Sequence, residues 1–175
     1  WTAMCLDAPF VCVGWYWLLA LGTGVRPTAP ATFTLFLSVW LAYLADRWFD
    51  SWRLQHPEQG AHRHRFVHTH RTSLGLLWVI VLVITVAQAV AFLDPSTLRR
   101  GFLLLAGVLI YFAAIHLGPP RLRAIIPREV ATALILVLGI LLFLKPQSIP
   151  LALSGALAAL FATNCMLIGL WESTS

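Results

Sequence analysis

Two acidic residues, Asp46 and Asp50, lie four positions apart near the end of an apolar stretch. On a helix this spacing puts both carboxylates on one face, one turn apart. The predicted position is a helix C-terminus, where the macrodipole disfavours negative charge, so a cation must compensate. One interpretation is a magnesium site, because facing carboxylate oxygens hold this hard cation and, through it, a diphosphate. The other is local ion pairing of Asp50 with Arg47 or Arg53, three residues away on either side.

A basic, histidine-rich segment follows these acids and includes His64 and His68. Imidazoles at this spacing share a helix face, as in a metal site or a membrane hydroxylase. Such oxygenases need several histidine clusters, and the one other distant candidate is His116. The segment is more typical of a basic interfacial stretch whose Phe66 dips toward lipid.

The composition indicates what kind of fold positions these groups. Of the 175 residues, 59% are apolar and only 11% are charged, and the mean hydropathy is +0.82. Water-soluble domains are about half apolar and about a quarter charged, so an ordinary soluble globule is excluded. Twelve basic residues against seven acidic residues give a net charge of +5. Most of the basic residues lie between apolar segments, which favours membrane lipids as partners over nucleic acid.

Six apolar segments predict an all-α integral membrane protein with about six transmembrane helices. Each segment is apolar on all sides, as lipid-embedded helices are, and connections containing Pro or Gly separate most of them. A single polytopic membrane domain then covers residues 1–175, with one long basic loop at 47–71. The predicted segments are Ala8–Val25, Ala29–Ala45, Thr72–Leu93, Gly101–Gly118, Val130–Leu144 and Ser148–Trp171.

The orientation follows from the basic residues between the segments. Eight of the twelve fall on one side of the predicted bundle and four on the other. Cytoplasmic loops carry the excess of Lys and Arg, so the 47–71 loop and the N-terminus are predicted to be cytoplasmic. The opposite side holds Arg26, Arg99, Arg100 and Lys145.

Three polar residues lie inside the apolar segments. Gln88, in the third segment, is expected to hydrogen-bond to a neighbouring helix. Asn164, in the sixth, is either a similar contact or a functional residue, because polar groups at membrane depth are costly. His116, near the end of the fourth, is either an interfacial histidine or an axial ligand of a porphyrin-type pigment or haem.

The stretch around the acidic pair resembles the first acidic motif of the UbiA superfamily of intramembrane prenyltransferases. The family pattern is Asn-Asp-x-x-Asp-x-x-x-Asp at the cytoplasmic end of the second helix, often with Arg after the middle Asp. The stretch here reads Ala-Tyr-Leu-Ala-Asp-Arg-Trp-Phe-Asp over residues 42–50. Asp46, Arg47 and Asp50 match, whereas Ala42 and Tyr43 replace the opening Asn and Asp. The resemblance implies that Asp46 and Asp50 bind Mg²⁺ and that, with Arg47, they form the catalytic group.

The family's second acidic motif, at the end of its sixth helix, often begins with Asn and ends with Asp eight residues later. Asn164 and Glu172 keep these two ends, but the residues between them carry no charge. Family members have about nine helices, so the resemblance implies a UbiA-like helical bundle lacking the last three. It further implies substrate-binding roles, with the arginines as donors to the diphosphate. The implied residues are Tyr43, Arg63, Arg65, Arg71, Asn164 and Glu172.

Two function classes remain open. The resemblance implies an Mg²⁺-dependent transfer of a prenyl group from a diphosphate to an aromatic or tetrapyrrole acceptor. The alternative is a non-catalytic transmembrane subunit of a larger membrane complex, for example photosynthetic or respiratory. Such a subunit would bind lipid, isoprenoid, quinone or pigment. Tyr43 in place of an acid and the uncharged interior of the second motif favour this alternative.

Overall fold

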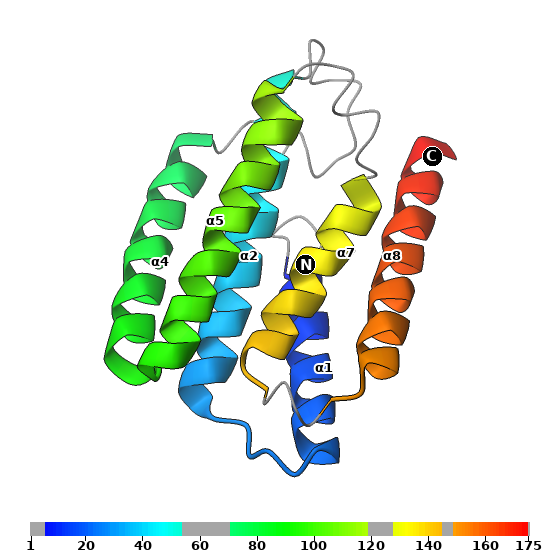
Figure 1. The fold of residues 1–175 in the computed structure, drawn as a ribbon. Coiled ribbons are helices and arrows are strands. Elements are labelled where there is room, and N and C mark those ends of the chain that lie inside the picture. The colour runs from blue at the N-terminus through cyan, green and yellow to red at the C-terminus, as the bar shows by residue number, and fades with distance from the viewer. Residues whose placement is uncertain (1–5, 54–70, 119–127, 145–148, 175) are drawn as a thin grey trace. The chain divides into compact units, whose positions relative to one another are not determined.

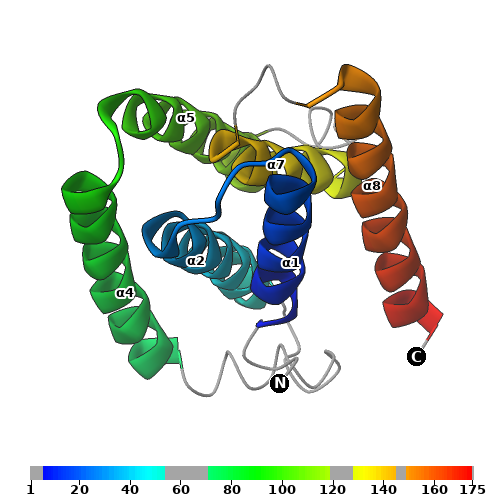
Figure 2. The same cartoon turned by 90° about the horizontal axis from the view of Figure 1, so that it is seen from below.

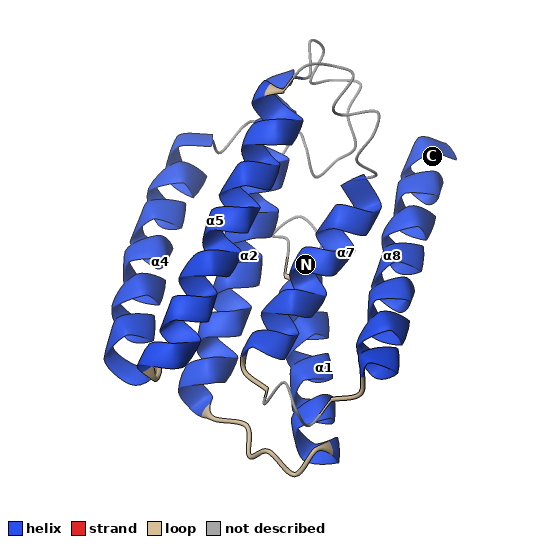
Figure 3. Cartoon of the chain, viewed as in Figure 1, coloured by secondary structure: helices blue, strands red, loops and turns tan. Residues whose placement is uncertain are grey.

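The computed structural model describes residues 6–53, 71–118, 128–144 and 149–174, which form six helices (Figure 1). Within these residues there is helix and loop but no strand (Figure 3). The all-α prediction and its six helices are therefore confirmed for the described part of the chain. The helices are α1 (Asp7–Gly22), α2 (Ala29–Arg53), α4 (Arg71–Phe92), α5 (Pro95–Leu117), α7 (Arg128–Leu142) and α8 (Leu151–Thr174).

Two helix boundaries differ from the predicted segments in ways that matter for the site. Helix α2 continues past Ala45 to Arg53, so the first residues of the predicted 47–71 loop are helical. Residues 54–70 lie outside the described residues. Helix α5 begins at Pro95, ahead of the predicted Gly101. Asp and Pro are favoured at the N-cap and at the first helical position, which explains the earlier start directly after Asp94.

The chain divides into two compact units, and α1 contributes to both. The first unit comprises Trp1–Trp17 and Pro27–Asp94, with the start of α1, α2 and α4. The second comprises Leu18–Arg26 and Pro95–Ser175, with the end of α1, α5, α7 and α8. In the first unit α2 lies between α1 and α4, and in the second α7 lies between α5 and α8 (Figures 1 and 2).

The core of the first unit forms where α2 packs on α4. Trp40, Leu41 and Leu44 of α2 are buried together. The indole N–H of Trp78 on α4 donates a hydrogen bond to the backbone carbonyl of Leu41, at 2.9 Å. This bond fixes the position of α4 along the axis of α2, in the part of α2 that precedes Asp46 and Asp50. The partly buried apolar side chains that α4 packs against this cluster are Leu74, Trp78, Val81 and Leu82.

Gln88 holds the other end of the contact between α2 and α4. Its Nε2 donates hydrogen bonds to the backbone carbonyl of Pro30, at 3.1 Å, and to Oγ1 of Thr34, at 3.3 Å. Thr34 is buried. An amide in an apolar helix is costly unless another helix pairs with it, so these bonds favour one register of α4 on α2. The predicted interhelical role of Gln88 is confirmed.

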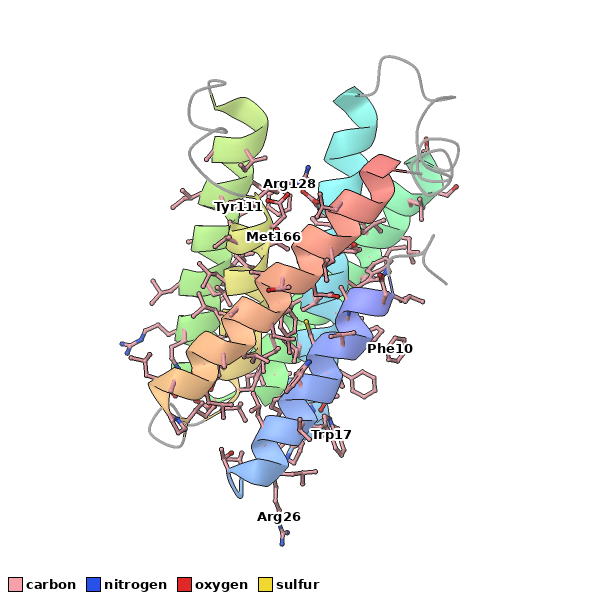
Figure 4. All side chains as sticks on the ribbon, turned by 90° about the vertical axis from the view of Figure 1, so that its right-hand side faces the viewer. Phe10, Trp17, Arg26, Tyr111, Arg128 and Met166 are labelled. Carbon is pink, nitrogen blue, oxygen red and sulfur yellow. The ribbon has the colours of Figure 1, made fainter. Side chains whose placement is uncertain are left out.

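Helix α1 packs on the first part of α2 through aromatic side chains. The rings of Phe10 and Phe36 meet edge to face, with centroids 5.1 Å apart and an interplanar angle of 77°. The indole N–H of Trp17 donates to Oγ1 of Thr32 at 3.1 Å. Phe10 and Trp17 are labelled along α1 in Figure 4. Thr28 precedes α2, and its hydroxyl accepts the backbone N–H of Ala31 at 3.4 Å, as an N-cap residue does.

In the second unit, α1 ends in a Schellman motif centred on Gly24. The N–H of Val25 donates to the carbonyl of Ala20 at 2.8 Å, and the N–H of Gly24 donates to that of Leu21 at 3.2 Å. Gly24 has a φ of 71°, the left-handed conformation that this motif requires and that glycine adopts most easily. These bonds satisfy the last helix carbonyls and turn the chain toward Arg26.

The remaining core of the second unit lies along α7. Ala133, Val137 and Ile140 are buried and recur at helical spacing, so they occupy one face of α7. The hydroxyl of Tyr111 on α5 donates to the backbone carbonyl of Arg128, at 3.5 Å, and so links α5 to the start of α7. Sequence analysis gave no indication of this bond, because the phenol is bonded to backbone and not to a characteristic side chain.

Three of the described helices are long and apolar enough to cross a membrane. The candidate spans are Ala29–Asp46, Thr72–Phe92 and Pro95–Ile115, and only 6% of the residues in each of the last two are buried. Helices α1 and α8 contain shorter apolar stretches, Asp7–Gly22 and Leu151–Leu167. The 15 residues of α7 reach about 22 Å, less than the roughly 30 Å of a bilayer core. The six membrane crossings stay a prediction, and so does the cytoplasmic location of the N-terminus and of residues 47–71.

Candidate functional site at the end of α2

The acidic pair lies on one uninterrupted helix. Because α2 runs from Ala29 to Arg53, the backbones of Asp46 and Asp50 are one helical turn apart. Asp46 is the last residue of the candidate membrane span, so the pair is at the boundary between the apolar and the polar parts of α2. The Asp46 side chain is half-buried and interacts with other groups. The side chains of Asp50 and Arg47 lie outside the described residues.

Tyr43 lies one turn before Asp46 and belongs to the apolar core. Its half-buried side chain packs against Trp40, Leu41 and Leu44. At this position the UbiA pattern has an acid. A tyrosine ring extends the hydrophobic contact instead, and a phenol oxygen is a weaker ligand for a hard cation than a carboxylate is. Tyr43 is therefore a packing residue of the α2 core, three residues before Asp46.

Helix α4 packs against the same part of α2. Trp78 contacts the same cluster as Tyr43, and its hydrogen bond to the Leu41 carbonyl is five residues before Asp46. Sequence reasoning did not find Trp78. Its partner is a backbone atom 37 residues away, and no spacing or residue type marks such a contact.

The predicted arginines are only partly described. Arg71 is the first residue of α4, in the same unit as the acidic pair, but its side chain lies outside the described residues. Arg63 and Arg65 lie outside them altogether, as do the histidines of that segment. Their predicted contact with a diphosphate stays a prediction.

The second motif lies on α8, in the other unit. Asn164 is exposed, in the second half of the helix, and Glu172 is in its last turn with a side chain outside the described residues. UbiA-like packing would place Asn164 near Tyr43 across a common central cavity. This stays a prediction, because α2 and α8 belong to separate units.

The donor set at the end of α2 is small. Among the side chains that the structure describes, no three His, Cys, Asp or Glu residues group into a metal site. Magnesium does not require such a group, because it is commonly bound by one or two carboxylates together with substrate phosphates and water. The two carboxylates of the acidic pair therefore match the number that a magnesium site takes from a protein.

Comparison with known protein families, curated proteins and solved structures finds no match for the chain. The resemblance to the UbiA superfamily therefore depends on the residues of α2 and α8 themselves.

Proposed function

We propose that this chain is a UbiA-like integral membrane protein whose α2 carboxylates bind the magnesium complex of a prenyl diphosphate. The activity proposed with it is transfer of the prenyl group to an aromatic or tetrapyrrole acceptor. One observation carries the proposal: Asp46 and Asp50 follow one another by a single turn on a continuous helix. That turn begins where the apolar span ends.

This position suits a substrate that is polar at one end and apolar at the other. A diphosphate must stay near water, whereas its prenyl chain is stable in the hydrocarbon layer. The boundary residue Asp46 lies one turn after Tyr43, whose apolar ring is only half-buried. The carboxylates would hold the head of the substrate there, and the apolar residues below them would contact its chain.

Catalysis in this proposal is mainly electrostatic. When bound, magnesium would neutralise charge on the departing diphosphate. Asp46 and Asp50 would fix where that charge develops, and Arg47 would add a donor suited to phosphate oxygens. Because Tyr43 takes the place of an acid, the pair has fewer oxygen ligands than the family pattern, and we expect weaker binding of the metal.

The test is binding of a prenyl diphosphate analogue to the purified protein with and without magnesium. Asp46→Asn should weaken magnesium-dependent binding by more than about tenfold, or about 1.4 kcal/mol. Asp94→Asn is the matched control. This carboxylate follows the end of α4 where Gln88 contacts Pro30, at the opposite end of α2 from Asp46, and its loss should leave binding unchanged. A parent protein that shows no magnesium-dependent binding would overturn the proposal.

A non-catalytic subunit is the second candidate, and the exposed apolar surface of α4 favours it. Large side chains such as Leu76 and Val83 are 65% and 62% exposed. A surface of this kind faces either lipid or another membrane chain. For this candidate we expect the protein to purify from its native membrane in fixed stoichiometry with other subunits, and magnesium to have no effect on diphosphate binding.

A further inference from the structure

Helix α5 begins with two adjacent arginines at one end of a candidate membrane span. Arg99 and Arg100 lie in the second turn of α5, and the span Pro95–Ile115 has few buried residues. Arg99 is exposed and Arg100 is half-buried. Charged side chains at the end of an otherwise apolar span are expected at the level of the lipid headgroups.

The guanidinium of Arg100 is held back toward the start of the helix. Its Nε donates to the backbone carbonyl of Ser96 at 3.3 Å, and its Nη2 donates to Oγ1 of Thr97 at 3.2 Å. Within the part of the chain that the structure describes, these bonds engage two of the five N–H donors of a guanidinium. The group is thus anchored beside the membrane boundary, with donors left for an anion.

An exposed apolar strip continues from Arg99 along the same face of α5. Leu103, Ala106, Ile110 and Ala113 follow at helical spacing, and all four are exposed. Leu103 and Ile110 are among the most exposed large side chains of the chain, at 68% and 70%. From Arg99 to Ala113 the strip measures about 21 Å, enough for an acyl chain that crosses half of a bilayer core, about 15 Å.

The charges at this end of α5 select the headgroup. The two guanidiniums and the positive end of the helix macrodipole outweigh the single carboxylate of Asp94, which directly precedes the helix. A zwitterionic lipid would bring its own ammonium group close to them. An anionic phospholipid brings only the phosphate, which arginine binds as a bidentate donor.

We propose that α5 carries a binding site for an anionic phospholipid. The phosphate lies against Arg99 and Arg100, and one acyl chain lies on the strip from Leu103 to Ala113. The inference depends on the membrane location proposed above but not on prenyl transfer.

The experiment measures the affinity of the full chain, in detergent micelles, for phosphatidylglycerol and for phosphatidylcholine with identical acyl chains. Native mass spectrometry resolves each bound lipid. The parent should bind phosphatidylglycerol more tightly. Each arginine near the membrane surface contributes about 1 kcal/mol toward an anionic lipid, so Arg99→Gln should weaken binding about fivefold. Arg99→Gln with Arg100→Gln should weaken it about thirtyfold.

Arg26→Gln is the matched control. Arg26 is exposed on the turn after α1, where its side chain extends away from the helices (Figure 4). This substitution removes the same charge but should leave phosphatidylglycerol affinity unchanged. Inorganic phosphate at the lipid concentration should not displace the lipid, because it cannot use the apolar strip.

Three results would overturn the proposal: equal affinity for the two lipids, an equal loss in Arg26→Gln, or displacement by inorganic phosphate. High-yield dimers cross-linked through Leu103→Cys in bilayers would also overturn it, because a second copy would then cover the strip. Asp46→Asn should keep its phosphatidylglycerol affinity, so failure of the diphosphate site is distinguished from failure of this one. Release of the chain from membranes by carbonate would refute the shared membrane location.

Discussion

Replacing Gln88 by leucine tests how α4 is held on α2. Leucine keeps most of the side-chain volume but removes both hydrogen bonds that Nε2 donates, at 3.1 Å to the Pro30 carbonyl and at 3.3 Å to Oγ1 of Thr34. Interhelical hydrogen bonds in membrane proteins are worth about 0.6 kcal/mol each on average. Gln88→Leu should therefore lower the free energy of unfolding by about 1.2 kcal/mol, or about sevenfold in the equilibrium constant.

A third hydrogen bond between these helices, from Trp78, gives an independent test. Trp78→Phe keeps an aromatic ring in the cluster but loses the single bond to the Leu41 carbonyl, at 2.9 Å. The expected loss is about 0.6 kcal/mol. Residues 78 and 88 are about 15 Å apart along α4, so the two losses should add to about 1.8 kcal/mol in the double variant.

The assay is reversible unfolding in mixed micelles with increasing denaturing detergent. Unfolding is followed by far-ultraviolet circular dichroism, because this signal reports helix content and does not depend on the indole of Trp78. Thr163→Val is the control, because the exposed Thr163 hydroxyl donates to the Ala159 carbonyl of its own helix, at 2.8 Å, and not to another described helix. That variant should stay within about 0.5 kcal/mol of the parent. A Gln88→Leu protein as stable as the parent would show that these hydrogen bonds do not hold α4 on α2.

Four further outcomes are expected. Gly24→Ala should lower the unfolding free energy by about 1 kcal/mol in the same assay, because its φ of 71° strains any Cβ although nothing lies within 4 Å of it. Val137→Ala, at a buried site, should cost about 1–2 kcal/mol, whereas Val83→Ala, at a 62% exposed site, should cost nothing measurable. A cysteine introduced at Gln59 should be labelled only from the cytoplasmic side, and labelling from outside sealed cells would reverse the predicted orientation. Asn164→Leu should leave stability unchanged or raise it, in contrast to Gln88→Leu.

The helices could be predicted because long apolar runs indicate helices, and Pro and Gly residues indicate the connections between them. Hydropathy located the apolar part of α2, the candidate span Ala29–Asp46, but not the end of the helix, since α2 continues to Arg53 through residues that are polar or aromatic. The Asp94–Pro95 pair lies in one of the connections predicted between apolar segments, yet it also marks the first turn of α5. Hydropathy therefore indicates where lipid can lie, and capping residues indicate where helices begin.

The site could be predicted only where it depends on local spacing. The four-residue interval was enough to predict that Asp46 and Asp50 lie one turn apart on the same helix. The surroundings of Tyr43 required knowledge of α4, because Trp78 reaches a backbone atom that has no sequence signature. For the same reason, the bond from Tyr111 to the Arg128 carbonyl had no sign in the sequence.

Two amides in apolar helices show how far such reasoning extends. Gln88 and Asn164 gave the same signal in the sequence, a polar group at membrane depth that needs a partner. Gln88 hydrogen-bonds to Pro30 and Thr34 within the first unit, so its role is structural. Asn164 is exposed, so the packing of α8 on α7 would not offset the cost of its amide if α8 lies in lipid. Leucine should therefore be tolerated there without loss of stability. If Asn164 faces a prenyl diphosphate, the same substitution should lower the affinity for the analogue, and unchanged affinity would remove Asn164 from the proposed site.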